Sequence, residues 1–204
     1  MKFYYKIIIV LFVVFVAIDA YWVFSKYKNI QRDVYEARKE KTVAKVLEKT
    51  KDLVQPEHFT DPDFKKNASV FENLFESLRT PEFFRVKIWN ADYRVIWSNL
   101  TEIIGSRAPE NDEVKEALSG EVAFELKSLK PEQITERDFP NFSETYVPIK
   151  DEAGKVVGVV EAYQASTIVD LTVQSELQTV VRPIIFGSLI LFLVLAVILR
   201  FIYK

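Results

Sequence analysis

The chain has 204 residues, with 27 Lys and Arg against 29 Asp and Glu, one histidine and no cysteine. That length holds about one domain together with membrane segments. The lack of cysteine excludes disulfides, thiolate zinc sites and cysteine nucleophiles, and a single histidine excludes multi-histidine metal clusters. The five glycines form none of the glycine-rich nucleotide-binding loops. We therefore expect no enzyme, no cofactor and no resident metal.

Two apolar stretches are long enough to cross a bilayer. The first surrounds Ile7–Ile18 and reaches, with its aromatic flanks, the roughly 20 residues of a spanning helix. We assign residues 1–25 to an uncleaved anchor, because Ile18 stands where signal-peptide cleavage requires a small residue. The second span, residues 184–203, follows Pro183, which we expect at a helix start, where proline is tolerated.

The charges beside the two spans favour cytoplasmic termini. Lys2 and Lys6 lie before the first span, and Arg200 and Lys204 lie at the end of the second. The loop between the spans is far longer than the roughly 60 residues over which the Lys and Arg count sets orientation, and large domains cross largely regardless of charge. We expect a two-pass protein of the inner (plasma) membrane, with its central domain outside the cytoplasm and both termini inside.

Residues 26–55 contain no glycine or proline and predict a long amphipathic helical stem. The stem is basic, with nine basic and four acidic residues from Lys26 to Lys51. The part from Asp52 to Pro183 is acidic, with fourteen basic and twenty-four acidic residues, which argues against a nucleic-acid partner. Two alternatives remain open for the stem: a coiled-coil homodimer with a second copy, or packing on its own domain.

The region from residue 56 to 165 changes from helical to strand periodicity. A helix ends near Leu78, after which Phe84, Val86 and Ile88 alternate with three more polar positions. The further expected elements are a hairpin of 84–89 and 95–97, a short helix from about 112 to Gly120, and strands at 122–126, 144–149 and 156–163. An exit helix, residues 166–183, leads to the second span. This order predicts an α+β fold, with the long amino-terminal helix packed on a five-stranded antiparallel sheet.

Three sequence segments carry a family resemblance: VKIWNADYRVIWSN, IIGSRAPENDEVKEALSGE and ETYVPIKDEAGKVVGVVEAY. Over residues 83–165 the chain resembles the extracytoplasmic PAS-like, single Cache sensor domains of bacterial membrane receptors, the input region of sensor histidine kinases. Tyr93 departs from the pattern, since such domains often have glycine in this turn. No kinase or other output region follows the second span in this sequence. The output is therefore expected from a cytoplasmic or membrane partner, or from the rest of a longer receptor.

The resemblance implies a small-molecule ligand between the sheet and the segment from residue 98 to 120. The candidate ligand-binding residues are Trp97, Arg107, Glu144, Tyr146 and Tyr163. Arg107 would pair with a carboxylate, and Trp97 with Tyr146 would form apolar walls. The alternative readings are an ordinary core position for the aromatic residues and an ordinary surface position for Arg107.

Two functions follow from this organisation. The first is a membrane-anchored extracytoplasmic sensor, as in two-component systems, which passes a ligand-induced change through two transmembrane helices. The second is a membrane protein without a sensing role, whose exposed acidic head binds another protein as an assembly or regulatory subunit.

Overall fold

The computed structural model describes residues 2–128 and 141–203. The chain forms two compact units. Unit 1 contains residues 1–36 and 169–204, and unit 2 contains residues 37–168. The predicted spans fall in unit 1 and the predicted domain, 56–165, falls in unit 2, although residues 129–140 of that domain lie outside the described part.

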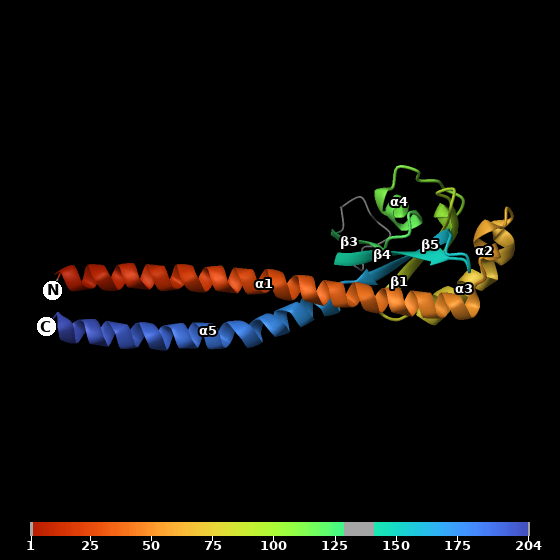
Figure 1. The fold of residues 1–204 in the computed structure, drawn as a ribbon. Coiled ribbons are helices and arrows are strands. Elements are labelled where there is room, and N and C mark those ends of the chain that lie inside the picture. Colours follow the sequence, from red (N-terminus) through yellow and green to blue (C-terminus); the bar gives the residue numbers. More distant parts are fainter. Residues whose placement is uncertain (1, 129–140, 204) are drawn as a thin grey trace. The chain divides into compact units, whose positions relative to one another are not determined.

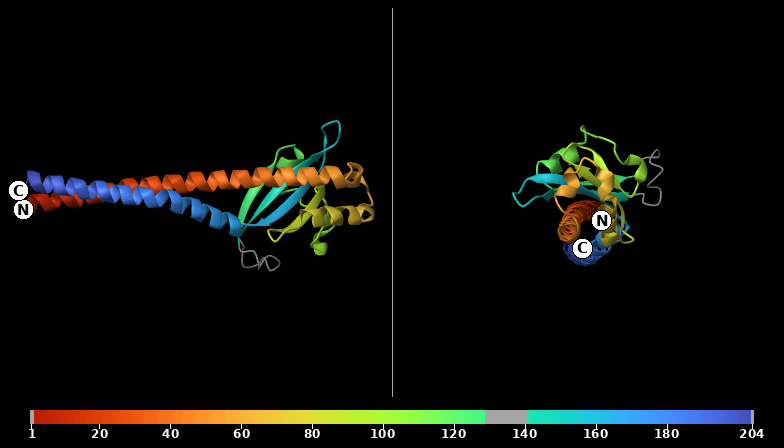
Figure 2. Two further views of the ribbon diagram at one scale, coloured as in Figure 1. Left: turned by 90° about the horizontal axis from the view of Figure 1, so that it is seen from below. Right: turned by 90° about the vertical axis from the view of Figure 1, so that its right-hand side faces the viewer.

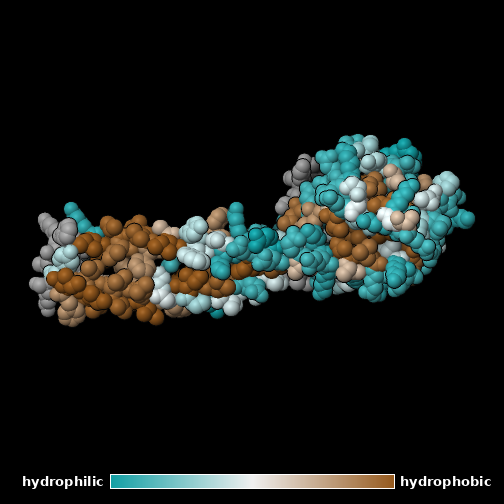
Figure 3. Space-filling model, viewed as in Figure 1, coloured by the Kyte–Doolittle hydropathy of each residue, from teal (hydrophilic) through white to brown (hydrophobic). Residues whose placement is uncertain are grey.

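Unit 1 consists of the first part of α1 (Lys2–Leu53) and most of α5 (Thr167–Ile202). Within this unit the two helices run side by side in opposite directions (Figures 1 and 2), and the ring of Phe192 meets the rings of Phe12 and Phe15 edge to face, with centroids 5.6 and 6.0 Å away. Each helix contains an 18-residue apolar window of which no part is buried. Figure 3 shows this apolar surface along the unit. Length and composition therefore allow both helices to cross a membrane.

Pro183 lies inside α5 and not at a helix start. The expected helix start at this residue is wrong, because the exit segment and the second apolar stretch form one helix from Thr167 to Ile202. Proline removes one backbone hydrogen bond and kinks or strains a helix. The long runs of helix-forming residues on both sides keep the remaining bonds, so the helix continues through it.

Unit 2 is built on one sheet. Its strands are β1 (Phe83–Asn90), β2 (Val95–Ser98), β3 (Ala123–Ser128), β4 (Asn141–Lys150) and β5 (Val156–Ala165). They pair in the order β2-β1-β5-β4-β3, and every neighbouring pair is antiparallel. The predicted α+β class and five-stranded antiparallel sheet are confirmed.

One face of the sheet packs on helices. The carboxyl-terminal part of α1, the short α2 (Glu57–Thr60), the 3-10 turn at Phe64–Asn67 and α3 (Ala68–Leu78) lie on this side. The core between them contains Val46, Phe71 and Leu74 from the helices and Val86 and Val160 from the strands, all fully buried. The predicted packing of the long amino-terminal helix on the sheet is thus confirmed within unit 2.

The other face of the sheet lies under a smaller cover. A 3-10 turn at Thr101–Ile103 is followed by α4 (Asp112–Leu118), which Figure 1 shows on the side away from α1. The Asn111 side chain caps α4 by accepting a hydrogen bond from the Val114 backbone N–H at 2.8 Å. Val114 and Ala117 of α4 are fully buried against this face.

The β1–β2 turn contains a residue with left-handed backbone conformation that is not glycine. Tyr93 has a φ of 57°, in the region that glycine adopts most easily. The Asn90 side chain stabilises the turn, since its Oδ1 accepts hydrogen bonds from the backbone N–H groups of Asp92 and Arg94, both at 3.0 Å. The turn therefore keeps the shape that glycine would give it.

A register shift between Phe83 and Arg85 changes the face to which Phe84 points. The ring of Phe84 lies 6.0 Å from the centroids of Phe142 and Tyr163, on the face opposite Val86 and the helices. The expected alternation, with Phe84, Val86 and Ile88 on one face, is wrong for Phe84, because a β-bulge adds one residue to the strand and breaks the period of two.

The contact between α1 and the sheet is unusually polar. Thr42 of α1 donates its hydroxyl to Gln164 Oε1 at 2.6 Å. The hydroxyls of Thr50, Ser143 and Thr145 are also buried, but they have no hydrogen-bond partner among the described residues. A buried hydroxyl without a partner costs stability, so this contact is less favourable than a fully apolar one would be.

The unpaired hydroxyls predict an unusual response to substitution. Thr145→Val keeps the shape of the side chain and removes a buried group without a partner, so we expect the free energy of unfolding to rise by about 1 kcal/mol. Thr42→Val removes a hydroxyl that is paired, so we expect a loss of about 1 kcal/mol. Thermal unfolding followed by tryptophan fluorescence measures both, and a loss of stability in Thr145→Val would contradict the assignment.

Candidate functional site

Charged and phenolic side chains gather on the sheet face opposite α1. The strand register places Lys87 opposite Glu161, and Glu144 opposite Tyr163. Cross-strand partners share a face, so these side chains meet. We use the name polar cluster for the following group: Lys87 and Trp89 of β1, Glu125 and Lys127 of β3, Glu144 and Tyr146 of β4, and Glu161 and Tyr163 of β5.

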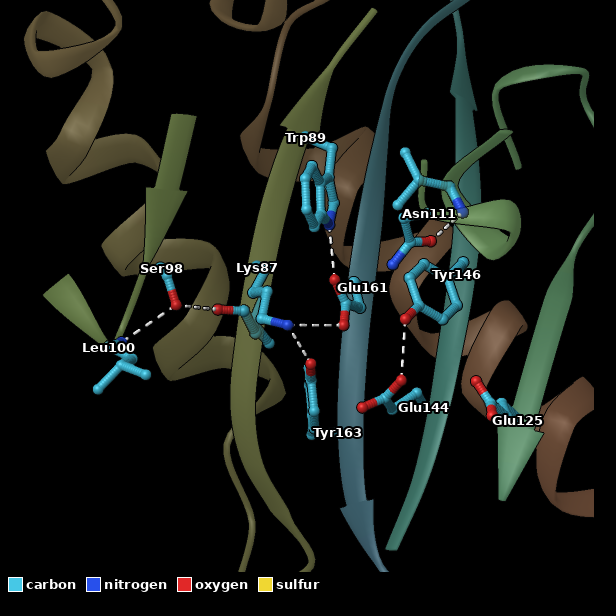
Figure 4. Close-up of polar contacts among 12 residues, drawn as sticks. Lys87, Trp89, Ser98, Leu100, Asn111, Glu125, Glu144, Tyr146, Glu161 and Tyr163 are labelled. Atoms are coloured by element: carbon cyan, nitrogen blue, oxygen red, sulfur yellow. Dashed lines mark hydrogen bonds and ion pairs between the residues drawn. The ribbon is translucent and has the colours of Figure 1, made fainter. Parts of the chain in front are cut away.

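Glu161 is the deepest member of the polar cluster. It is fully buried, and two residues of β1 bind its carboxylate (Figure 4). Lys87 Nζ lies 3.0 Å from Oε1, and Trp89 Nε1 donates to Oε2 at 2.6 Å. The same ammonium group donates to the Tyr163 hydroxyl and lies 4.6 Å from the centre of that ring. The carboxylate therefore has both a charged and a neutral donor.

Glu144 is the second buried carboxylate, with 3% of its surface exposed. Its Oε2 accepts a hydrogen bond from the Tyr146 hydroxyl at 2.8 Å and lies 2.8 Å from Lys127 Nζ. Lys127 also pairs with Glu125 Oε2 at 3.1 Å. The outer strands thus supply a second lysine between two carboxylates, and the polar cluster carries three acidic and two basic groups.

Burial shifts the pKa values of several members of the polar cluster. It raises the pKa of Glu144, and the nearby charge of Glu161 raises it further, against the opposing effect of Lys127. Burial alone would lower the pKa of Lys127, but its hydrogen bonds and charge interactions with Glu144 and Glu125 are stronger, and the pKa rises. Burial, and next the charge of Glu161, also raises the pKa of both tyrosines, which therefore remain hydroxyl donors at neutral pH.

Aromatic rings border the polar cluster. The rings of Phe142 and Tyr163 lie 5.7 Å apart, and the guanidinium of Arg85 lies 5.7 Å from the Tyr163 centroid, within cation–π range. At the other end, Trp89 and Tyr146 pack with residues of α4. The face combines buried acceptors, ammonium donors and aromatic surfaces, the chemistry that holds a small polar molecule. Within residues 2–128 and 141–203, no group of three His, Asp or Glu side chains is placed to hold a metal ion.

The structure brings together three of the five predicted site residues. Glu144, Tyr146 and Tyr163 all belong to the polar cluster. Trp97 does not, since it is buried on the helix-covered face with its ring 5.9 Å from that of Phe75. Arg107 is exposed, and its backbone forms an isolated bridge with Arg94. Ligand binding by Trp97 and Arg107 stays a prediction, and these residues lie outside the polar cluster.

The residues that surround these three are not evident from the local sequence pattern. Lys87, Trp89 and Glu161 did not stand out, although Glu161 interrupts the apolar run VVGVVEAY. A charge in the middle of a buried strand needs a partner, which is the signal that was available. The identity of that partner depends on the pairing of β1 with β5, two strands separated by more than sixty residues.

Comparison with known proteins gives limited likenesses. No family model matches the sequence, and no curated protein matches it. Among solved structures, a sensory box sensor histidine kinase from Vibrio cholerae is 18% identical with a TM-score of 0.33, over 49% of this chain and 92% of that one. An extracellular ligand binding receptor from Desulfohalobium retbaense DSM5692 is 12% identical with a TM-score of 0.44, over 71% of this chain and 24% of that one.

A third likeness is to the PAS domain of Bordetella pertussis BvgS, which is 14% identical with a TM-score of 0.27, over 41% of this chain and 73% of that domain. All three TM-scores are below 0.5.

The buried carboxylates predict a pH dependence of stability. The fold raises the pKa of Glu144, so the folded state favours the protonated side chain. The resulting contribution of Glu144 to the free energy of unfolding is fully present below the ordinary glutamate pKa of about 4.3, and it is lost as the pH rises through the raised pKa. We expect the difference in unfolding free energy between wild type and Glu144→Gln to shift in favour of the variant as the pH increases above about 4. Denaturant unfolding at a series of pH values measures this difference.

Tyr146→Phe is the control for this experiment. It removes the hydroxyl that donates to Glu144 but keeps both buried carboxyl groups, so it should lower stability and retain the pH dependence. Parallel stability curves for wild type and Glu144→Gln across the whole range would contradict the prediction.

Proposed function

We propose that unit 2 is the sensor domain of a membrane-anchored receptor, and that it binds a small polar molecule at the polar cluster. The main observation that supports this site is the burial of two carboxylates, Glu144 and Glu161, with 3% and 0% of their surface exposed. Charged pairs in a protein interior seldom add more stability than apolar residues of the same size. Clusters of buried titratable groups are typical of functional sites instead.

A ligand at this site would compete with contacts that the protein makes to itself. The Lys87 ammonium already occupies the space between Glu161 and the ring of Tyr163. Lys87 and Lys127 retain 20% and 32% of their side-chain surface exposed, whereas their carboxylate partners are buried. The lysine side chains are therefore able to move away from their carboxylate partners, and a ligand that binds them would rearrange the charges around β5.

The end of β5 connects the polar cluster to both long helices. Gln164 and Ala165, immediately after Tyr163, accept hydrogen bonds from α1: the Thr42 hydroxyl binds Gln164 at 2.6 Å, and Arg38 Nη2 binds the Ala165 carbonyl at 2.7 Å. Two residues later the chain enters α5. A shift of β5 that follows ligand binding would thus act on the helix that holds it and on the helix that continues from it.

We further propose that α1 and α5 cross the inner membrane, with unit 2 outside and both termini in the cytoplasm. The apolar, unburied windows and the opposite directions of the two helices within unit 1 support this topology. The signal would then pass to a cytoplasmic or membrane partner, or to further domains of the receptor. This proposed function involves no catalytic step. The homodimer through the stem helix remains a prediction.

Ligand binding is tested with the full chain in bilayer discs, against separate organic acids, amines, sugars and ions. A ligand at 100 times its Kd adds about 2.7 kcal/mol, which raises the Tm of a unit of this size by several degrees. We expect Lys87→Met to lose most of that shift and the exposed Arg107→Ala to retain it. A folded protein that responds to nothing in the panel would favour the alternative, a head that binds another protein.

Topology is tested with single cysteines, since the natural chain has none. Glu152→Cys places a thiol in the turn between β4 and β5, and Lys6→Cys places one near the amino terminus. A membrane-impermeant maleimide applied to intact cells, with the outer barrier permeabilised where there is one, should label the first and reach the second only after lysis. Labelling in the reverse order would place unit 2 in the cytoplasm and contradict the proposed topology.

A further inference from the structure

A groove lies on the helix-covered side of unit 2, on the opposite face of the sheet from the polar cluster. Its volume is about 1160 Å³, slightly above the roughly 300–1,000 Å³ of typical small-molecule sites. It runs between α1 and the β4–β5 hairpin. Its apolar walls are Val43, Leu47 and Val54 from α1 and the segment that follows, and Val147, Ile149 and Val157 from the strands.

The helix wall of the groove leaves apolar surface open to solvent. Leu47 is 44% exposed, although Val46, its neighbour in the same helix, is fully buried. On the strand side, Ile149 and Val157 are both 7% exposed. Figure 3 shows apolar surface on unit 2 between α1 and the strands, in the view of Figure 1. A concave site with exposed apolar walls favours an apolar occupant.

One buried polar side chain lies among these apolar walls, while the other neutral polar residues of the lining, Gln55 and Thr60, are exposed. Thr50 lines the groove, is 3% exposed, and its hydroxyl has no hydrogen-bond partner within the described part of the chain. A buried hydroxyl without a partner is unfavourable, and a molecule in the groove with a hydrogen-bonding group that reaches this hydroxyl would relieve it. The occupant therefore needs a mainly apolar body and a single polar group.

The rim selects against a charged occupant. Three basic residues line the rim, Lys51, Lys150 and Lys155, and three acidic residues balance them, Glu57, Asp151 and Glu152. The two sets give no net charge at the entrance. Charge complementarity therefore favours a neutral molecule.

The edge of β4 disfavours a peptide as the occupant. The pairing of β4 with β3 ends at Tyr146, opposite Ala123, and Pro148 follows in the part of β4 that lines the groove. Proline has no backbone N–H and interrupts the ladder that an added strand requires. A small molecule needs no such ladder.

We propose that this groove is a second binding site, for a small, uncharged, mainly apolar molecule that carries one hydrogen-bonding group such as a ketone. One wall of the groove belongs to α1 and the other to β4 and β5. An occupant would bridge them and strengthen the contact that the unpaired hydroxyls weaken. The site is separate from the polar cluster, so unit 2 would receive two inputs of different chemistry.

The absence of cysteine from the sequence permits a direct test on the full chain in bilayer discs. Leu47→Cys places a thiol in the groove, and Leu53→Cys places one on the same helix, at a site 39% exposed that does not line the groove. Each variant is equilibrated under partly reducing conditions with four thiol fragments of similar size, which carry a ketone, an alkyl group, a carboxylate or an ammonium group. Intact-mass spectrometry then counts the fragment retained.

We expect Cys at position 47 to retain the ketone and alkyl fragments about tenfold more than either charged fragment, because burial of some 60 Å² of apolar surface gives about that factor. Cys at position 53 should show no such preference. Adding Thr50→Val to Leu47→Cys should remove the advantage of the ketone over the alkyl fragment and leave the alkyl fragment bound. Both cysteines replace exposed side chains, and unfolding followed by tryptophan fluorescence verifies the fold.

Three outcomes would overturn the proposal. Equal retention at the two positions would show that the groove holds nothing, and a preference for a charged fragment would assign a different ligand class. A disulfide between two chains at position 47 would show that a second copy covers the groove.

Discussion

The buried charge of Glu161 is the constraint on which unit 2 depends. This carboxylate sits in the central strand β5, fully removed from water, and is held by Lys87 and by the Trp89 indole, both from β1. An ionised group at that depth is tolerated only while its donors remain in place. The register of β1 against β5 is therefore fixed by charge as well as by the pleat, because a slip of one residue would move both donors to the opposite face. Tyr163 extends the same arrangement along β5, where the Lys87 ammonium binds its hydroxyl.

Buried polar groups on the two faces of the sheet differ in whether they have partners. On the α4 side, the charged groups of the polar cluster are paired with one another at 2.8 to 3.1 Å. On the α1 side, Thr42 and Arg38 are paired with the end of β5, and the neutral hydroxyls of Thr50, Ser143 and Thr145 have no partner among the described residues. A neutral hydroxyl without a partner costs far less than an unpaired charge. The unpartnered hydroxyls therefore make the packing of α1 on the sheet less favourable than a fully apolar contact would be.

The secondary structure of unit 2 follows closely from local pattern, while the polar cluster does not. Strand-type runs bounded by turn residues predict all five strands, and the acidic residues before Val114 predict the start of α4. Tyr146 and Tyr163 stood out as large aromatic residues on strands. Lys87 and Glu161 are unremarkable until the sheet order makes β1 and β5 neighbours, because strand pairing over a long sequence distance is a property of the whole chain. Local deviations have the same origin: the bulge at Phe84 and the continuation of α5 through Pro183 depend on what packs on either side.

Under the function we propose, one strand, β5, would serve both binding and transmission. Its middle carries Glu161 and Tyr163, its end carries the Gln164 side chain and the Ala165 carbonyl that hold α1, and α5 begins two residues later. A change in the charges around the middle of the strand alters its pairing with β1, and the same strand cannot adjust without moving the acceptors at its end. The unpaired hydroxyls make the α1 contact less favourable than a fully apolar one would be, which lowers the cost of such a movement. A two-state element requires two packings that differ little in free energy, because the ligand then needs to outweigh only that small difference.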